Sequence, residues 1–241
     1  MEVAQDFKDL LRQAGQLVRQ HRWLLIGAFL FAVAGVVFLL PFDPLWAPKP
    51  DVGVNPTLRH LATELRFWGD YQTGSLLIAG LLWLLGRIWR IRNWRVAALA
   101  CLLAATFAGL EVNVVRFTAG RPRPSVKVPD RLHGPTLDTD YHSFPSAHSA
   151  TSFGTAGALA VALPPIGVPA LFGAVAVAWS RLYLKSHYPT DVWMGAWVGM
   201  LNGIVFGSAA RRLFCRQASL SMSTPANPAR QPSAGSTIQR R

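Results

Sequence analysis

Residues 149–180 read SATSFGTAGALAVALPPIGVPALFGAVAVAWS, which is 32 consecutive positions without a charged side chain. A helix crosses a bilayer with about 20 mostly apolar residues, so this stretch is too long for one crossing. Proline breaks a helix because it lacks the backbone N–H, and Pro164 and Pro165 stand mid-stretch with Gly167 close behind. The stretch therefore predicts a helical hairpin in a membrane.

Four further apolar runs flank this hairpin. They cover 23–40, 71–86, 96–115 and 192–210, and the third is interrupted only by Glu111 and Asn113. Each run suits one crossing, and the first is followed by PFDP rather than by the small residues of a signal-peptide cleavage site. The expected fold is all-α, a six-transmembrane-helix bundle that keeps its first helix.

The composition excludes several other classes of protein. Hydrophobic residues make up 51% and charged residues 15% of the chain, whereas a typical soluble domain has about 25% charged residues. Two cysteines are too few for a disulfide scaffold, and no Cys and His cluster has zinc spacing. The net charge of +12 comes mainly from arginines that lie between apolar runs, so nucleic acid is not an expected partner.

Basic residues in short loops indicate the orientation of the helices. Basic clusters at 8–22, 87–95 and 211–216 fall on one side in a six-helix count, which makes that side and both termini cytoplasmic. The loops 41–70 and 116–147 and the junction 181–191 then share the opposite face, although 116–147 also carries five basic residues.

Two shorter segments have apolar residues at helical spacing. Segment 1–22 predicts an amphipathic helix on the cytoplasmic surface. Segment 54–68 predicts another on the opposite side, with Asn55 as N-cap and Pro56 as the first helical residue. Packing beneath the bundle is an equal alternative for both. The expected organisation is therefore an amphipathic segment over 1–22, a six-helix domain over 23–216 and a disordered tail over 217–241.

Three polar clusters fall on the non-cytoplasmic face. They are RFTAGRPRP at 116–124, FPSAH at 144–148 and SRLYLKSHYPTD at 180–191. Each alone is a weak signal, because a histidine at a helix end is often structural and arginines at a membrane edge often extend to the interface. Together they bring arginines, two histidines and an aspartate to one face.

Such a set of residues can bind and cleave a phosphate ester without a metal or other cofactor. Arginines stabilise the charge of a phosphoryl group, and backbone N–H groups near Ser146 and Ala147 can add donors at a helix start. His187 and Asp191 are four positions apart, so Asp191 can orient one imidazole nitrogen while the other attacks phosphorus. His148 is then the candidate acid and base.

These motifs resemble the type 2 phosphatidic acid phosphatase family, whose signatures read K-x6-RP, PSGH and SR-x5-H-x3-D. All three occur here in order and with matching internal spacing, within residues 23–212. The resemblance implies a metal-independent phosphatase that acts on membrane lipid phosphates through a phosphohistidine. It also implies an integral protein of the bacterial inner membrane whose site faces the periplasm or exterior.

By position, the resemblance makes His187 the nucleophile, His148 the acid and base, and Asp191 the residue that orients the nucleophile. The implied phosphate-binding residues are Arg116, Arg123, Arg181, Ser146 and Ala147. Two of these depart from the family pattern. Arg116 replaces Lys, which keeps the charge but changes the donor geometry, and Ala147 replaces Gly, which adds a Cβ near the phosphate.

The motifs concern only the phosphoryl group, so they do not rank the possible lipids. Undecaprenyl diphosphate, phosphatidylglycerophosphate, phosphatidic acid and lipid A phosphate are all candidate substrates. Two other functions stay open: a vanadate-dependent haloperoxidase, which resembles this family at the same site, and a membrane protein that binds lipid phosphates without cleaving them. Six membrane spans favour the phosphatase over the haloperoxidase.

Overall fold

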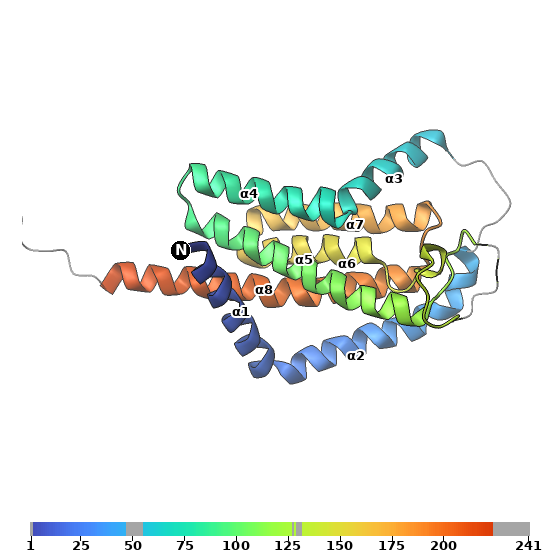
Figure 1. The fold of residues 1–241 in the computed structure, drawn as a ribbon, viewed down its shortest axis with the longest axis horizontal. Helices are drawn as coiled ribbons and strands as arrows, with labels where there is room; N and C mark the ends of the chain where they lie inside the picture. Colours follow the sequence, from blue (N-terminus) through green and yellow to red (C-terminus); the bar gives the residue numbers. More distant parts are fainter. Residues whose placement is uncertain (1, 47–54, 127, 129–131, 224–241) are drawn as a thin grey trace, which may run out of the picture.

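The computed structural model of the chain describes residues 2–46, 55–126, 128 and 132–223. Within these ranges it holds eight α-helices and three short helical turns, and most helices run along one long axis (Figure 1). The helices are α1 (Glu2–Gln20), α2 (Arg22–Leu39), α3 (Pro56–Gly69), α4 (Leu76–Ile88), α5 (Arg92–Ala119), α6 (Ala147–Ala162), α7 (Pro164–Tyr183) and α8 (Pro189–Ser223). The turns are η1 (Leu40–Trp46), η2 (Tyr71–Ser75) and η3 (Thr139–Tyr141).

The expected hairpin is formed by α6 and α7, which are separated by Leu163 alone. Pro164 and Pro165 occupy the first turn of α7, where a missing N–H removes no helical hydrogen bond. Gly167 lies so close to α6 that a Cβ there would be 1.9 Å from the backbone nitrogen of Ala160. The turn therefore needs glycine at this position.

Small residues bring α6 and α8 together in the centre of the bundle. A Cβ at Gly199 would lie 2.2 Å from the carbonyl oxygen of Ala150, and one at Gly203 would lie 2.9 Å from the nitrogen of Ala158. Glycines recur every four residues from 195 to 207, so one face of α8 lies directly against α6. This packing places the start of α6 beside the start of α8, where two of the three motifs lie.

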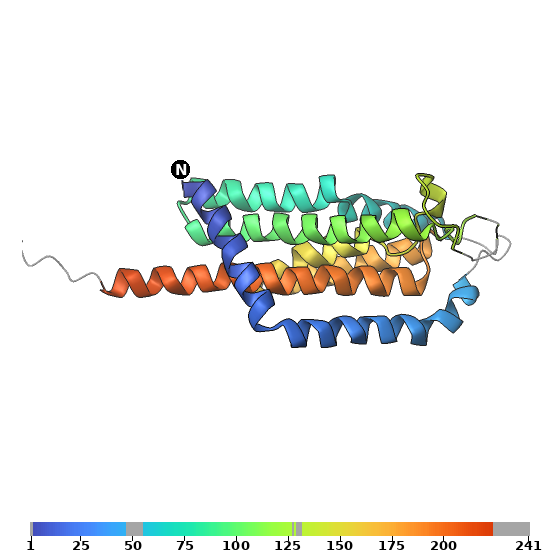
Figure 2. The same cartoon turned by 60° about the horizontal axis from the view of Figure 1, so that its bottom comes forward.

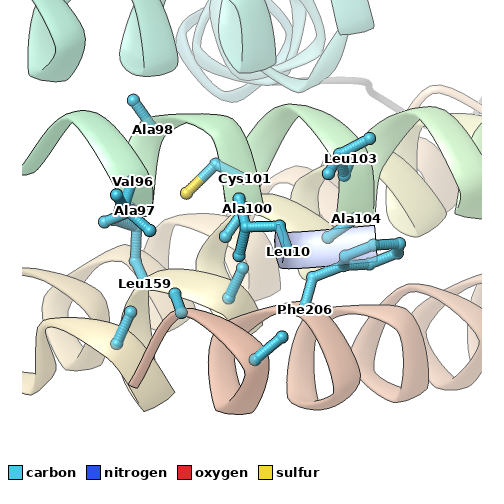
Figure 3. Close-up of a cluster of buried hydrophobic side chains, with 14 of the residues drawn as sticks. Leu10, Val96, Ala97, Ala98, Ala100, Cys101, Leu103, Ala104, Leu159 and Phe206 are labelled. Atoms are coloured by element: carbon cyan, nitrogen blue, oxygen red, sulfur yellow. The ribbon is translucent and has the colours of Figure 1, made fainter. Parts of the chain in front are cut away.

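The main apolar core is formed by residues of α1, α5, α6 and α8 (Figure 3). It contains Val96, Ala100, Leu103 and Ala104 of α5, Leu159 of α6, Phe206 of α8 and Leu10 of α1. Leu10 is fully buried, and Asp6 on the same helix pairs with Arg92 at the start of α5. The first amphipathic segment is therefore a helix that packs against the bundle.

The second amphipathic segment has the expected start. The side chain of Asn55 accepts hydrogen bonds from the backbone nitrogens of Thr57 at 2.9 Å and Leu58 at 3.3 Å, and Pro56 is the first residue of α3. This cap satisfies N–H groups that a helix leaves without partners at its beginning. The helix α3 lies near the same end of the bundle as η1 and the link between α7 and α8 (Figure 1).

Four helical segments are long and apolar enough to cross a membrane: Arg22–Trp46, Arg92–Ala119, Pro164–Tyr183 and Pro189–Gln217. The helices α4 and α6 have 13 and 16 residues, so helix length alone does not establish the six expected crossings. The helix α8 continues to Ser223, beyond the expected domain end at 216, and residues 224–241 of the expected tail lie outside the described residues.

A carboxyl group inside a membrane span needs a partner, and Glu111 on α5 has one on α8. Its Oε2 accepts a hydrogen bond from the side-chain nitrogen of Asn202 at 2.8 Å. Polar contacts of this kind hold helices together where lipid cannot supply hydrogen bonds. Glu111 thus joins two helices.

The two ends of the bundle carry different residues. The connection between α4 and α5, with Arg87, Arg90, Arg92 and Arg95 in and around it, lies at the end toward which α8 runs out (Figures 1 and 2). The other end holds the turn η1, the link from α5 to α6 and the link from α7 to α8. All three motifs are therefore at the end opposite the arginine-rich connection.

Candidate active site

One cavity lies where three segments meet: the end of α5, the start of α6 and the link between α7 and α8. Together with η2 they enclose a volume of about 550 Å³. Five of the eight predicted site residues line it: Arg116, Arg123, Ala147, His148 and His187. The other three, Ser146, Arg181 and Asp191, are buried outside its lining. The structure thus gathers both histidines and two of the three predicted arginines around one cavity.

His187 is held by the link between α7 and α8 and is almost fully buried. Its Nδ1 lies 2.7 Å from the carbonyl oxygen of Ser143 and 3.7 Å from the nearer carboxylate oxygen of Asp191. A proton on Nδ1 donates to the Ser143 carbonyl, which leaves Nε2 as the atom with a free lone pair. Burial lowers the pKa of His187 to about 4, although the Asp191 carboxylate acts in the opposite direction. The imidazole is therefore neutral at neutral pH.

Asp191 holds the backbone and side chains around His187. Its Oδ2 accepts hydrogen bonds from Ser143 Oγ at 2.5 Å and from the backbone nitrogen of Tyr188 at 2.7 Å. Since the carbonyl group of the same Ser143 contacts the imidazole, any orienting effect of Asp191 passes largely through this serine. Ser143 lies just before the second motif, and the sequence pattern did not single it out.

A buried charge network that the sequence did not predict lies behind the histidine. Nη1 of Arg121 donates to Oδ1 of Asp191 at 2.7 Å, and its Nη2 donates to Oδ2 of Asp43 at 2.8 Å. The three side chains are 6%, 0% and 1% exposed. Thr190 Oγ1 adds a bond to Asp43 Oδ2 at 2.5 Å, and the guanidinium lies over the Tyr188 ring.

This network ties the first connecting turn to the third motif. Asp43 belongs to η1, and its partner Arg121 is 78 positions away, within the first motif but outside its signature positions. No local pattern connects two residues at such a distance. An aspartate between two prolines directly after an apolar run was the available signal.

The predicted phosphate-binding arginines carry donors that the protein does not use. Arg116, Arg123 and Arg181 each have a buried Nε without a hydrogen-bond partner among the described residues, and Arg181 has a second such nitrogen, Nη1. Arg181 is 2% exposed. A buried cation with unpaired donors is unfavourable unless an anion binds to it. Donors of this kind can bind an anion with several acceptor oxygens.

Ser146 and Ala147 begin α6. Ser146 is the N-cap, since its Oγ accepts from the backbone nitrogen of Ser149 at 3.4 Å, and its own N–H donates to the carbonyl oxygen of Asp191 at 2.9 Å. That N–H is thus engaged within the protein, and Ala147 and His148 are left to offer backbone donors at the helix start. Ala147 is the first helical residue, a conformation that accommodates its Cβ.

His148 has a carboxylate neighbour of its own. Its Nε2 lies 3.8 Å from Oδ2 of Asp70, and Asp70 Oδ1 accepts from the backbone nitrogen of Gln72 at 2.9 Å. Asp70 therefore caps η2 and faces the candidate acid and base at the same time. No motif in the sequence indicated this role for Asp70.

Comparison with known proteins identifies the family. The sequence model of the PAP2 superfamily matches residues 94–214, which is half of the chain and includes all three motifs. The chain belongs to the PAP2 superfamily. This confirms the resemblance that the motifs indicated.

Curated relatives and a solved structure agree with this membership. The PAP2 chain is 28% identical over 221 residues to the lipid A 1-phosphatase of Rhizobium johnstonii, covering 81% of this chain and 85% of that protein. It is 31% identical over 188 residues to the decaprenylphosphoryl-5-phosphoribose phosphatase of Mycobacterium tuberculosis, covering 67% and 92%.

The solved structure is the first transmembrane PAP2 type phosphatidylglycerolphosphate phosphatase from Bacillus subtilis. It shares the fold with a TM-score of 0.58 at 21% identity, and the match covers 80% of this chain and 96% of that chain. With this family and its apolar helices, the PAP2 protein is an integral membrane phosphatase that acts on lipid phosphates.

Proposed function

We propose that this PAP2 protein transfers the phosphoryl group of a lipid phosphate first to His187 and then to water. In the first step His187 Nε2 attacks phosphorus, the P–O bond to the lipid breaks, and protonated His148 gives its proton to the leaving oxygen. In the second step His148 takes a proton from water as the water oxygen attacks phosphorus. The P–N bond breaks, orthophosphate leaves, and both histidines return to their starting states.

The observation that carries this proposal is the set of unpartnered arginine donors beside two histidines. Phosphoryl transfer spreads negative charge over the equatorial oxygens, and preorganised cations stabilise that charge most in a buried site. The buried nitrogens of Arg116, Arg123 and Arg181 suit this role.

The neutral state of His187 supports its role as nucleophile. A protonated imidazole has no lone pair to offer, and the lowered pKa of about 4 keeps His187 unprotonated at neutral pH. The hydrogen bond from Nδ1 to Ser143 directs the free lone pair to Nε2. Asp191 supports this geometry by fixing Ser143 and the backbone of Tyr188.

The proposed placement in the membrane has six crossings, with α4 and α6 added to the four long spans. η2 and α4 are continuous over 71–88, and α6 leads into α7 with one residue between them. The arginines around 87–95 and after 210 favour the cytoplasm for their end of the bundle, so both termini are cytoplasmic. The site then faces the periplasm or exterior of a bacterial inner membrane.

The proposed substrates are phosphate or diphosphate monoesters of membrane lipids. The relatives named above carry lipid A, decaprenylphosphoryl-phosphoribose and phosphatidylglycerolphosphate in their names, and these lipids share only a phosphate on a membrane anchor. Undecaprenyl diphosphate and phosphatidic acid belong to the same class. The residues of the three motifs act on this shared phosphate.

A phosphate-release screen tests the proposal. The full-length protein, purified in detergent, is given the lipid phosphates named above in the presence of EDTA, and orthophosphate is measured. We expect release from at least one lipid, because three arginines take the place that a metal holds in other phosphatases. The His187→Ala variant should release none. A strict Mg²⁺ requirement, or release by His187→Ala, would contradict the mechanism.

A further inference from the structure

One face of α5 carries small and polar residues that lead away from the phosphate site. Four residues of this face are three or four positions apart and line the cavity that contains His187: Thr106, Gly109, Asn113 and Arg116. At 1.5 Å per residue, the ten positions from Arg116 to Thr106 correspond to about 15 Å along the helix. The cavity therefore continues from the site into the membrane-spanning part of the bundle.

The opposite wall of this extension is η2. Tyr71 and Gln72 line the cavity, and the Tyr71 hydroxyl lies 2.7 Å from Thr106 Oγ1. One hydroxyl donates to the other in this contact, so one O–H donor remains. Gln72 brings a side-chain amide with two further N–H donors. We name the five lining residues Tyr71, Gln72, Thr106, Gly109 and Asn113 the linkage groove.

The linkage groove lies beside a residue that is exposed on the outside of the bundle. A Cβ at Gly109 would meet only Thr151 Cγ2, at 3.6 Å, so packing does not demand glycine there, and the missing side chain leaves space. Leu110, next in sequence, also lines the cavity and is 60% exposed on the bundle surface. The cavity therefore reaches the bundle surface at Leu110, where a lipid can approach it.

Hydrogen-bond donors at this depth are informative about the lipid. Polar side chains in a membrane span are unfavourable without polar partners, and a polyprenyl monophosphate offers none below its phosphate. An acylated glycerol or sugar places ester or amide carbonyl groups, which accept hydrogen bonds, directly below the phosphate. The remaining O–H of the Tyr71 and Thr106 pair and the Gln72 amide match such acceptors.

We propose that the linkage groove binds the carbonyl groups that join the phosphorylated headgroup to its acyl chains, which makes the substrate an acylated lipid phosphate rather than a polyprenyl phosphate. This inference rests on the proposed function, because it assumes that the phosphate lies at His187. The shared chemistry is the acyl carbonyl, which a diacylglycerol phosphate and an acylated glucosamine phosphate both supply.

Binding to the His187→Ala variant tests the inference without any turnover. The ligands are dioleoyl phosphatidic acid, its dialkyl ether analogue, a diacylated glucosamine 1-phosphate and farnesyl phosphate, and Kd is measured for each in detergent. The ether keeps the chains and the phosphate but lacks the carbonyl groups. We expect the diacyl lipid to bind about three- to tenfold more tightly than the ether for each hydrogen bond made. Tighter binding of the glucosamine lipid would identify the sugar as the source of the carbonyl groups.

Groove variants then locate the effect. Thr106→Val combined with Gln72→Leu should bring the ratio of ether to diacyl Kd close to one, whereas Thr118→Val, the same change on the exposed side of α5, should leave that ratio unchanged. A misfolded preparation weakens both ligands together, so the ratio reports the groove itself.

The inference would be overturned if the His187→Ala protein bound ester and ether with equal affinity or bound farnesyl phosphate more tightly. It would also be overturned if the groove variants left the ratio of ether to diacyl Kd unchanged. Because binding is measured without turnover, these results are separate from a failure of the phosphatase screen.

Discussion

Removing Arg121 should destabilise the protein strongly, because two buried carboxylates would lose the cation between them. Asp43 and Asp191 are 1% and 0% exposed, and both lie within 2.8 Å of an Arg121 nitrogen. Breaking a buried ion pair by removing one partner costs about 3–5 kcal/mol. For a chain of this size that corresponds to a fall in Tm of about 6–20 °C. We expect Arg121→Met to fall in this range.

Counting the buried charges predicts that removing Asp43 destabilises the protein less than removing Arg121. Asp43→Asn leaves Arg121 with Asp191 and weakens the hydrogen bonds that the Asp43 carboxylate accepts from Arg121 and Thr190, for about 1–3 kcal/mol. Combining Asp43→Asn with Arg121→Met removes one of the two stranded carboxylates. The double variant should therefore be more stable than Arg121→Met alone, which is the opposite of additive behaviour.

Thermal unfolding of the full-length protein in detergent, followed by tryptophan fluorescence, measures these differences. Asp9→Asn is the control, since Asp9 pairs with an Arg12 side chain that is 64% exposed, and such pairs contribute about 0–1 kcal/mol. Additive losses in the double variant, or an Arg121→Met effect no larger than that of Asp9→Asn, would refute the reasoning about the buried network.

Three further predictions follow from the site and its placement. In a Cys215→Ser background, a cysteine placed at 132–141 should react with an impermeant thiol reagent added outside the cell. A cysteine placed at 89–91 should react only when the reagent reaches the cytoplasmic side, and the reversed labelling would move the site to the cytoplasm. Arg116→Lys should keep substantial activity, because it restores the family residue, while Arg116→Ala should lose about 10²–10³ in kcat; equal rates would remove Arg116 from the site. Because the pKa of His187 is lowered to about 4, its ¹⁵N NMR resonance should titrate near pH 4, and titration near 6.5 would contradict the buried neutral state. The unfolded chain takes up this proton near pH 6.5, so the free energy of unfolding should decline as the pH falls from about 6.5 to 4.

Local rules made much of the fold and site predictable from the sequence. The α6 and α7 hairpin follows from a long apolar stretch with Pro164 and Pro165 in its middle, because proline acts on its own turn of helix. The Asn55 cap depends on residues two and three positions away. The order of the helices predicted that His148 and His187 share one cavity, because all three motifs lie at the same end of the bundle.

Contacts between distant segments escaped this reasoning. The pairing of Asp43 with Arg121 depends on where η1 packs against α8 and on the loop that follows α5. The position of Ser143 beside His187 depends on how the loop before α6 folds. The end of α8 was also misplaced, because the arginines after 210 indicate a membrane boundary and a helix can continue past such a boundary. These features are tertiary and have no sequence period.

Trapping of the phosphoenzyme tests the assignment of His187 as nucleophile most directly. The wild type, His148→Ala and His187→Ala proteins are mixed with a ³²P-labelled lipid diphosphate, quenched at high pH, and the label retained on protein is measured. A diphosphate has a good leaving group, so His148→Ala should complete the first step yet fail to activate water, a loss of about 10²–10⁴-fold in the second step. We predict that His148→Ala accumulates acid-labile label and that His187→Ala carries none; label that persists in His187→Ala, or that maps to another residue, would contradict the mechanism.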